Sequence, residues 1–115
     1  MKEEKFKVIN FIRKLVLNLD SLLDNFPKKD IEIKNRLRNN SYDLLELAYQ
    51  ANMTVNKEKR EEILDLTLAK VKIIDFLVNL CYDKQIINSK KYVKFGDSLE
   101  DINKYLIGWK KSFLD

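Results

Sequence analysis

Histidine is absent from the sequence, which removes the side chain that most often acts as a general base or metal ligand. Cysteine occurs once, at Cys81, so no disulfide can form within the chain and a reducing compartment, the cytoplasm, is expected. Nucleophilic catalysis would need Cys81 or a serine together with a base that the chain lacks. Two isolated glycines cannot build a phosphate-binding loop or a dinucleotide fingerprint. We therefore expect a protein that is not an enzyme.

Glycine and proline are rare, with two and one in 115 residues, so the chain has few turn signals and long helices are expected. No run of 18 uncharged apolar residues occurs, and we expect no membrane-spanning segment. The first residues, MKEEKFKVINFIRK, include acidic side chains and lack a small-residue cleavage site, so no signal peptide is expected. The length fits a single domain, residues 1–115, with one core.

Apolar residues recur at intervals of three and four, which is typical of one face of an α-helix. They predict four helices: residues 2–25, residues 28–53, a third that begins after Asn56, and a fourth that follows the Asn88-Ser89 break and reaches Phe113. Phe26-Pro27 ends the first helix, because the residue before proline is disfavoured in the helical region. Asn56 and Ser89 are the predicted N-caps of the third and fourth helices. Short connections predict an all-α, up-down-up-down four-helix bundle.

The residues expected in the core form one stripe on each helix. These stripes are Val8, Ile12, Leu15, Leu19, Leu22 and Phe26; Ile33, Leu37, Leu44, Leu47, Ala48 and Ala51; Leu64, Thr67, Val71, Ile74, Val78 and Cys81; and Tyr92, Phe95, Leu99, Ile102, Leu106, Trp109 and Phe113.

Four positions interrupt these stripes or stand out within them. Asn40 lies where the second helix needs an apolar residue, so it either sits inside the bundle and fixes register, or lies at the rim of a rotated helix. Thr67 is expected to pack its methyl group and to bond its hydroxyl to the preceding turn. Cys81 is expected to be a small buried hydrophobic residue. Gly96 marks either a close contact or a later start of the fourth helix.

Acidic residues cluster at residues 61–65 and 97–101, outside the apolar stripes. A di-metal site in a helical bundle needs Glu-x-x-His motifs on facing helices, which the chain does not contain. These clusters therefore indicate solvated helix faces, and we expect no metal and no cofactor.

Basic residues are distributed more unevenly than the acidic ones. They gather as Lys28, Lys29, Lys34, Arg36 and Arg38 after the Phe26-Pro27 break, as Lys90, Lys91 and Lys94 at the start of the fourth helix, and as Lys110 and Lys111 at its end. The chain has 22 Lys and Arg against 18 Asp and Glu, a net charge of +4 that permits binding to nucleic acid or anionic lipid without requiring it. Solvated faces are the alternative explanation, and the last two lysines also favour a helix C-terminus.

A second set of apolar residues lies outside the core stripes. It comprises Phe11, Leu17, Tyr42, Leu45, Tyr49, Ile73, Phe76, Tyr105 and Ile107. Helices that are apolar on more than one side are usually buried on more than one side. Part of this set is expected to widen the core, and the remainder indicates a protein interface, most simply one for self-association.

Two parts of the sequence carry a resemblance to a known family. The first is Asn25-Phe26-Pro27-Lys28-Lys29, followed by residues 33–38 and by 43–48 with Ala51-Asn52. The second contains Ile87, Ser89, Lys91-Tyr92 and residues 99–102, and ends in Tyr105-Leu106-Ile107-Gly108-Trp109-Lys110-Lys111-Ser112. Together they resemble the accessory variability determinant proteins of diversity-generating retroelements, within the wider group of bundle proteins encoded in ribosomal-RNA intervening sequences.

The resemblance implies a four-helix bundle that assembles as a homopentameric barrel and binds reverse transcriptase and RNA or DNA through a basic surface, without catalysing a step. In this chain Asp30 and Glu32 fall within the segment that the family makes more basic, and Asn103 and Ile107 stand where the family commonly has glycine. The ten clustered basic residues are the expected phosphate contacts. The alternative function is a structural or interaction module of the same fold that binds protein instead of nucleic acid.

Overall fold

The protein is an all-α four-helix bundle, as predicted. A computed structural model describes the backbone of residues 2–112 and the side chains of residue 5 and residues 7–112. Its elements are α1 (Lys2–Leu23), the short 3-10 helix η1 (Lys28–Asp30), α2 (Ile31–Met53), α3 (Lys57–Asp83) and α4 (Ser89–Lys111). No strand occurs within residues 2–112.

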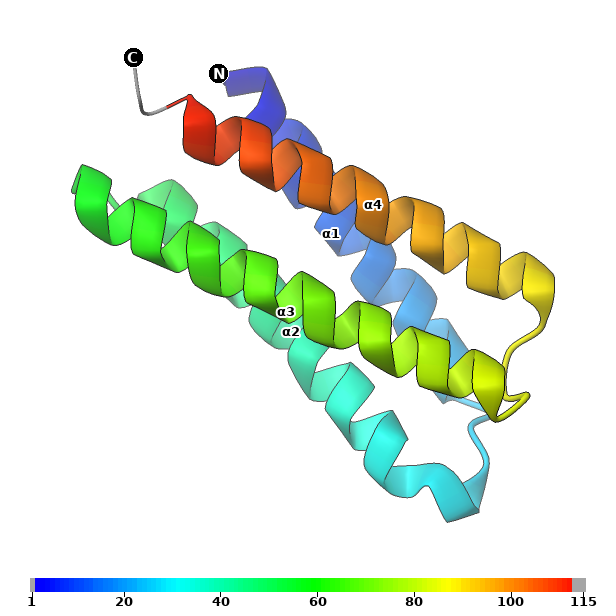
Figure 1. The fold of residues 1–115 in the computed structure, drawn as a ribbon. Coiled ribbons are helices and arrows are strands. Elements are labelled where there is room, and N and C mark those ends of the chain that lie inside the picture. The colour runs from blue at the N-terminus through cyan, green and yellow to red at the C-terminus, as the bar shows by residue number, and fades with distance from the viewer. Residues whose placement is uncertain (1, 113–115) are drawn as a thin grey trace.

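The helices alternate in direction, and each packs against two neighbours (Figure 1). Consecutive helices are in contact, and α4 returns to lie beside α1. The α1–α2 and α3–α4 connections therefore meet at one end of the bundle, which we call the loop end (Figure 1). The α2–α3 turn, the start of α1 and the finish of α4 lie at the other end, which we call the terminal end.

The α1–α2 connection is slightly longer than predicted. Helix α1 ends at Leu23, two residues before Asn25, and the Phe26 N–H then bonds the Leu23 carbonyl at 3.3 Å. Pro27 follows in an extended conformation, and the chain enters α2 through the 3-10 turn of η1. The predicted second helix thus does begin at Lys28, but its first turn is 3-10 rather than α.

Asparagine caps the two helices that begin after the remaining breaks. The Asn56 side chain accepts a hydrogen bond from the Lys59 N–H at 2.9 Å, which confirms the predicted cap of α3. At α4 the cap is Asn88, which accepts from the Lys91 N–H at 2.9 Å. The prediction of Ser89 was wrong by one residue. Ser89 is already the first residue of α4, and the side chain that caps the helix belongs to the residue before it.

Helix α3 ends in a C-terminal capping motif whose left-handed residue is not a glycine. Gln85 has φ 63°, in the left-handed region. Its N–H bonds the Tyr82 carbonyl at 2.9 Å, and the Ile86 N–H bonds the Cys81 carbonyl at 2.8 Å. This pair of bonds is the Schellman arrangement, which satisfies the last carbonyls of a helix and reverses the chain. It turns α3 into the short connection that begins α4.

All four helices contribute to one core. Its buried apolar residues are Val8, Ile9, Ile12, Leu15, Val16, Leu19, Leu23, Phe26, Leu37, Leu44, Ala48, Ala51, Leu64, Val71, Ile74, Leu77, Val78, Cys81, Ile87, Phe95, Leu99, Ile102, Leu106 and Trp109. The stripe predicted for α3, including Thr67, is buried throughout. Four predicted residues, Leu22, Ile33, Leu47 and Tyr92, are half-buried at its edges, and Leu23, next to Leu22, is fully buried. Phe113, also predicted, lies outside the described residues.

The two polar interruptions of the stripes have different explanations. Ser41, not Asn40, occupies the core position on α2, and the half-buried Asn40 lies at the rim. Of the two interpretations, the rotated helix is therefore correct. Thr67 is fully buried and donates its hydroxyl to the Ile63 carbonyl at 2.7 Å, as expected.

Gly96 follows neither of its two predicted explanations. Helix α4 begins seven residues earlier, at Ser89, so Gly96 is not a late start. A Cβ added at Gly96 would meet no atom within 4 Å, so the residue does not permit a close contact within the chain.

Candidate nucleic-acid interface

Two of the three basic clusters meet at the loop end, because α2 and α4 both begin there. Residues 20–38 and 83–94, which form this end, contain nine Lys and Arg against five Asp and Glu. The resulting excess of four positive charges equals the net charge of +4 of the whole chain. The rest of the bundle is therefore close to neutral, and the loop end is the basic part of the molecule.

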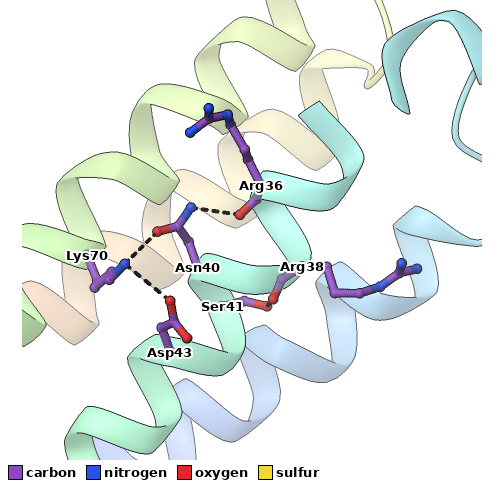
Figure 2. A network of polar contacts seen from close by, with 6 residues as sticks. All are labelled: Arg36, Arg38, Asn40, Ser41, Asp43 and Lys70. Carbon is purple, nitrogen blue, oxygen red and sulfur yellow. Dashed lines mark hydrogen bonds and ion pairs between the residues drawn. The ribbon is translucent and has the colours of Figure 1, made fainter. Parts of the chain in front are cut away.

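The cluster on α2 does not form a single face. Successive residues of an α-helix are about 100° apart, so residues four apart share a side and residues two apart point away from one another. Lys34 and Arg38 accordingly lie on one side of α2, and both are half-buried. Arg36 is exposed on another side, and Figure 2 shows the Arg36 and Arg38 side chains diverging.

Two acidic residues at the loop end, Asp30 and Glu32, each form an ion pair with a basic residue of the same end. The exposed Arg36 Nε lies 3.3 Å from Glu32 Oε1, one turn earlier on α2, and a pair this exposed holds its partners weakly. Asp30 is only 6% exposed and accepts a hydrogen bond from Lys84 Nζ at 3.0 Å. Lys84 thus ties the end of α3 to η1. Sequence reasoning missed Lys84 because it stands alone in the sequence, outside any basic run.

The lysines at the start of α4 line two surface hollows. Lys91 and Lys94 border a hollow of about 200 Å³ between α1 and α4. Lys91 also borders a wider hollow of about 720 Å³ at the α3–α4 connection, beside Tyr82 and Asn88. The Tyr82 ring there is stacked on Tyr92 with ring centroids 4.3 Å apart. Lys90, Lys91 and Lys94 are all exposed, so their ammonium groups are open to a ligand.

The third cluster is separated from the other two. Lys110 and Lys111 lie at the terminal end, 19 residues along α4 from Lys91, a rise of roughly 28 Å. Lys110 donates a hydrogen bond to Asp65 on α3, and this bond raises the pKa of Lys110. The ten predicted residues therefore do not share one surface: eight belong to the loop end, and Lys110 joins two helices elsewhere.

Polar contacts within α2 and between α2 and α3 engage Asn40 and Ser41, the last two residues of the Asn-Asn-Ser run (Figure 2). Lys70 of α3 donates to Asn40 Oδ1 at 3.0 Å and to Asp43 Oδ2 at 3.2 Å. Asn40 in turn donates its amide to the Arg36 carbonyl at 2.8 Å. Ser41 donates its hydroxyl to the Arg38 carbonyl at 2.9 Å. The network positions the two helices and engages Lys70, which lies midway along α3 and outside the loop end.

The residues that could carry nucleophilic or metal chemistry are not arranged for it within the described part of the chain. Cys81 is fully buried, and burial, followed by the nearby Asp30 carboxylate, raises the pKa of its thiol from 9.0 to about 11. The thiol is therefore protonated at neutral pH, which is the unreactive form. No group of three or more cysteine and acidic side chains is placed to hold a metal ion in this part of the chain.

Comparisons with protein-family models, curated proteins and solved structures found no match to this chain. Membership of the retroelement accessory family therefore remains a prediction from the resemblance. Within residues 2–112, no helix combines the length and the apolar character required to cross a bilayer.

Proposed function

We propose that this protein is a non-catalytic accessory protein that binds the phosphates of RNA or DNA through its loop end. One observation carries the proposal: the alternating helix order collects nine basic and five acidic residues at that end, while the remainder of the bundle is nearly neutral. Exposed lysine ammonium groups bind phosphate mainly by charge, so binding is expected to depend on salt and only weakly on base sequence.

The resemblance supplies the more specific part of the proposal. It implies that the chain belongs to a diversity-generating retroelement, with the element's reverse transcriptase as protein partner. A reverse-transcriptase gene and a variable repeat beside the gene for this chain would support this part of the proposal.

The test compares two charge-reversal variants that change net charge equally. One combines Lys28→Glu with Lys90→Glu at the loop end, and the other combines Lys57→Glu with Lys111→Glu at the terminal end. All four side chains are exposed, so neither variant should unfold. Affinity for a single-stranded RNA is measured by fluorescence anisotropy over a salt series.

The loop-end variant should lose at least about tenfold in affinity, and its log–log salt slope should fall by roughly 0.7 for each phosphate contact removed. The terminal-end variant should bind nearly as the unmodified protein does. Equal losses in both variants would show that net charge acts without a defined surface. No binding by the unmodified protein at low salt would overturn the proposal.

The second candidate function is a protein-interaction module. It is favoured by the large apolar side chains that remain exposed on α3, namely Leu66, Ile73 and Phe76. Exposed apolar residues grouped on one helix are typical of a surface that another protein covers.

A further inference from the structure

Helix α3 is apolar on two sides. Its inner stripe runs from Leu64 to Cys81 and is buried in the core. A second stripe, which we call the outer stripe, consists of Leu66, Ala69, Ile73, Phe76 and Leu80. Its spacing of three and four residues is the heptad pattern by which one helix packs against another. The outer stripe continues for four turns without a charged residue in it.

The outer stripe is largely open to solvent. Leu66 is 57% exposed, Ile73 48% and Phe76 62%, and only Leu80 is half-buried. Leu66 and Ile73 also border a hollow of about 460 Å³ between α3 and α2, whose lining is half apolar and half polar or charged and includes Leu47 on the opposite wall. The exposed side chains of the outer stripe thus form a ridge, and the hollow beside it forms a groove, which are the two features that meet when helices pack.

The order of residues along the outer stripe suits a second copy of the same chain. Across a two-fold axis near position 71, Ala69 faces Ile73 of the second copy, and Leu66 faces its Phe76. Leu66 and Phe76 then form an apolar pair, as do Ala69 and Ile73, and every contact occurs twice, as an isologous interface requires. The next outward layers place Glu62 opposite Leu80, and Lys59 opposite Asp83. An ion pair therefore closes each end of the apolar contact.

Charge selects the antiparallel direction over the parallel one. In a parallel pair each residue of the stripe faces its own copy, so Lys59 would face Lys59, Glu62 would face Glu62 and Asp83 would face Asp83. Like charges at close range are destabilising, and such repulsion is how helix pairs select their direction. The antiparallel pair also places each basic loop end beside the nearly neutral terminal end of its partner.

Lysines next to the symmetry axis are compatible with this pairing. Lys70 is engaged by Asp43 and Asn40 of its own chain, so its charge is already balanced. Lys72 lies on the α4 side of α3, next to Asp75.

We propose that the outer stripe of α3 is a two-fold interface at which a second copy of the chain packs antiparallel, with Ala69 facing Ile73. This inference does not depend on nucleic-acid binding. It differs from the homopentamer implied by the resemblance, because a ring of five joins two different faces of each copy, whereas this stripe pairs with itself.

The first experiment measures solution mass by sedimentation over a concentration series without nucleic acid. The unmodified protein should approach twice its monomer mass of 13.7 kDa as concentration rises. Phe76→Glu should raise the dimer dissociation constant at least about 100-fold, since it places two unpaired charges in the interface. The control Leu17→Glu introduces the same charge at a 69% exposed apolar position on α1 and should leave the dissociation constant unchanged.

The second experiment tests the antiparallel register by exchanging charges. Lys59→Glu alone and Asp83→Lys alone should each weaken the dimer, because each creates a like-charge pair. The double variant should restore dimerisation. Residues 59 and 83 are roughly 36 Å apart along one helix, so they can restore each other only between two copies. Lys59→Glu places an acidic residue in the first turn of α3, and Asp83→Lys places a basic residue in its last turn. Both changes interact favourably with the helix dipole, so the variants should fold.

The possible outcomes distinguish a dimer formed through the outer stripe from a monomer and from a pentamer. Dimers that are weakened by Phe76→Glu and restored by the double exchange support the proposal. A monomer at every concentration would show that the stripe does not bind its own copy. A five-fold mass, or equal sensitivity to Leu17→Glu and Phe76→Glu, would also overturn it.

Discussion

At the scale of single residues, the neighbours Asn40 and Ser41 have different roles that the sequence alone does not distinguish: Ser41 is buried in the core, and Asn40 forms a hydrogen bond between two helices. Ser41 can be buried because its hydroxyl is satisfied by the Arg38 carbonyl of its own helix. An asparagine amide has more donors and acceptors than one helix can satisfy, and Asn40 therefore lies at the rim, where Lys70 of α3 reaches it. The two side chains differ by one position, which turns them about 100° apart.

Trp109 gives a residue-scale prediction. It is 2% exposed and closes the described part of the α4 stripe. Trp109→Ala should lower the free energy of unfolding by about 3–5 kcal/mol, because it removes a large buried side chain and leaves a cavity. Urea denaturation followed by circular dichroism measures the change. Leu17→Ala, at an exposed position, is the control and should change the free energy by less than about 0.5 kcal/mol. Equal effects would show that Trp109 is not in the core.

At the scale of the elements, α3 shows why periodicity predicts a helix more securely than it predicts its surroundings. The inner and outer stripes have the same spacing, and the inner one was correctly expected in the core. The apolar residues that the sequence places outside the core stripes included Ile73 and Phe76 but not Leu66. Phe11 and Tyr105, of the same set, pack against each other between α1 and α4 with centroids 5.4 Å apart and widen the core, as was expected of part of that set. Neighbouring helices decide which side of each helix is covered.

Gly96 gives an element-scale prediction. It lies inside α4, and an added Cβ would meet nothing within 4 Å. Gly96→Ala should therefore raise the free energy of unfolding by about 1 kcal/mol, since alanine loses less backbone entropy on forming a helix. Thermal and urea denaturation both measure the change. A decrease in stability would mean that the hollow beside Gly96, between α3 and α4, is occupied in solution.

At the scale of the whole molecule, helix order determines where charge accumulates. Because directions alternate, the starts of α2 and α4 share the loop end, and basic residues about 60 positions apart in the sequence meet there. The finish of α4 lies at the terminal end, which removes Lys110 and Lys111 from this surface. Antiparallel pairing through α3 would place two loop ends at opposite ends of a dimer.

This arrangement gives a prediction that combines both proposals. Each copy should bind one short single-stranded RNA, and the monomeric Phe76→Glu variant should bind it with the same stoichiometry and an affinity matching that of Leu17→Glu, which carries the same charge. A longer RNA that reaches both loop ends should bind the dimer more tightly than the monomer, since the second contact becomes intramolecular. Isothermal titration measures both quantities. Loss of short-RNA binding in Phe76→Glu alone would show that the site needs two copies.

Most of the fold was predictable from the sequence, because it depends on local patterns. Apolar spacing determined four helices, and scarce glycine and proline left them long. Cap positions were predictable to within a residue, with Asn88 replacing Ser89, because capping depends on a few neighbouring atoms. The left-handed Gln85 was not predictable, since the residue has no intrinsic preference for that conformation.

The sequence by itself determined the helices, their core stripes and the absence of histidine chemistry, since each depends on residue type and spacing alone. Only the tertiary structure decided that eight of the ten clustered basic residues share one end, that Asn40 is at the rim, and that Leu66 joins Ile73 and Phe76 on an exposed stripe. These features depend on the rotation of each helix and on its neighbours. Both follow from packing the whole core at once, which no local pattern encodes.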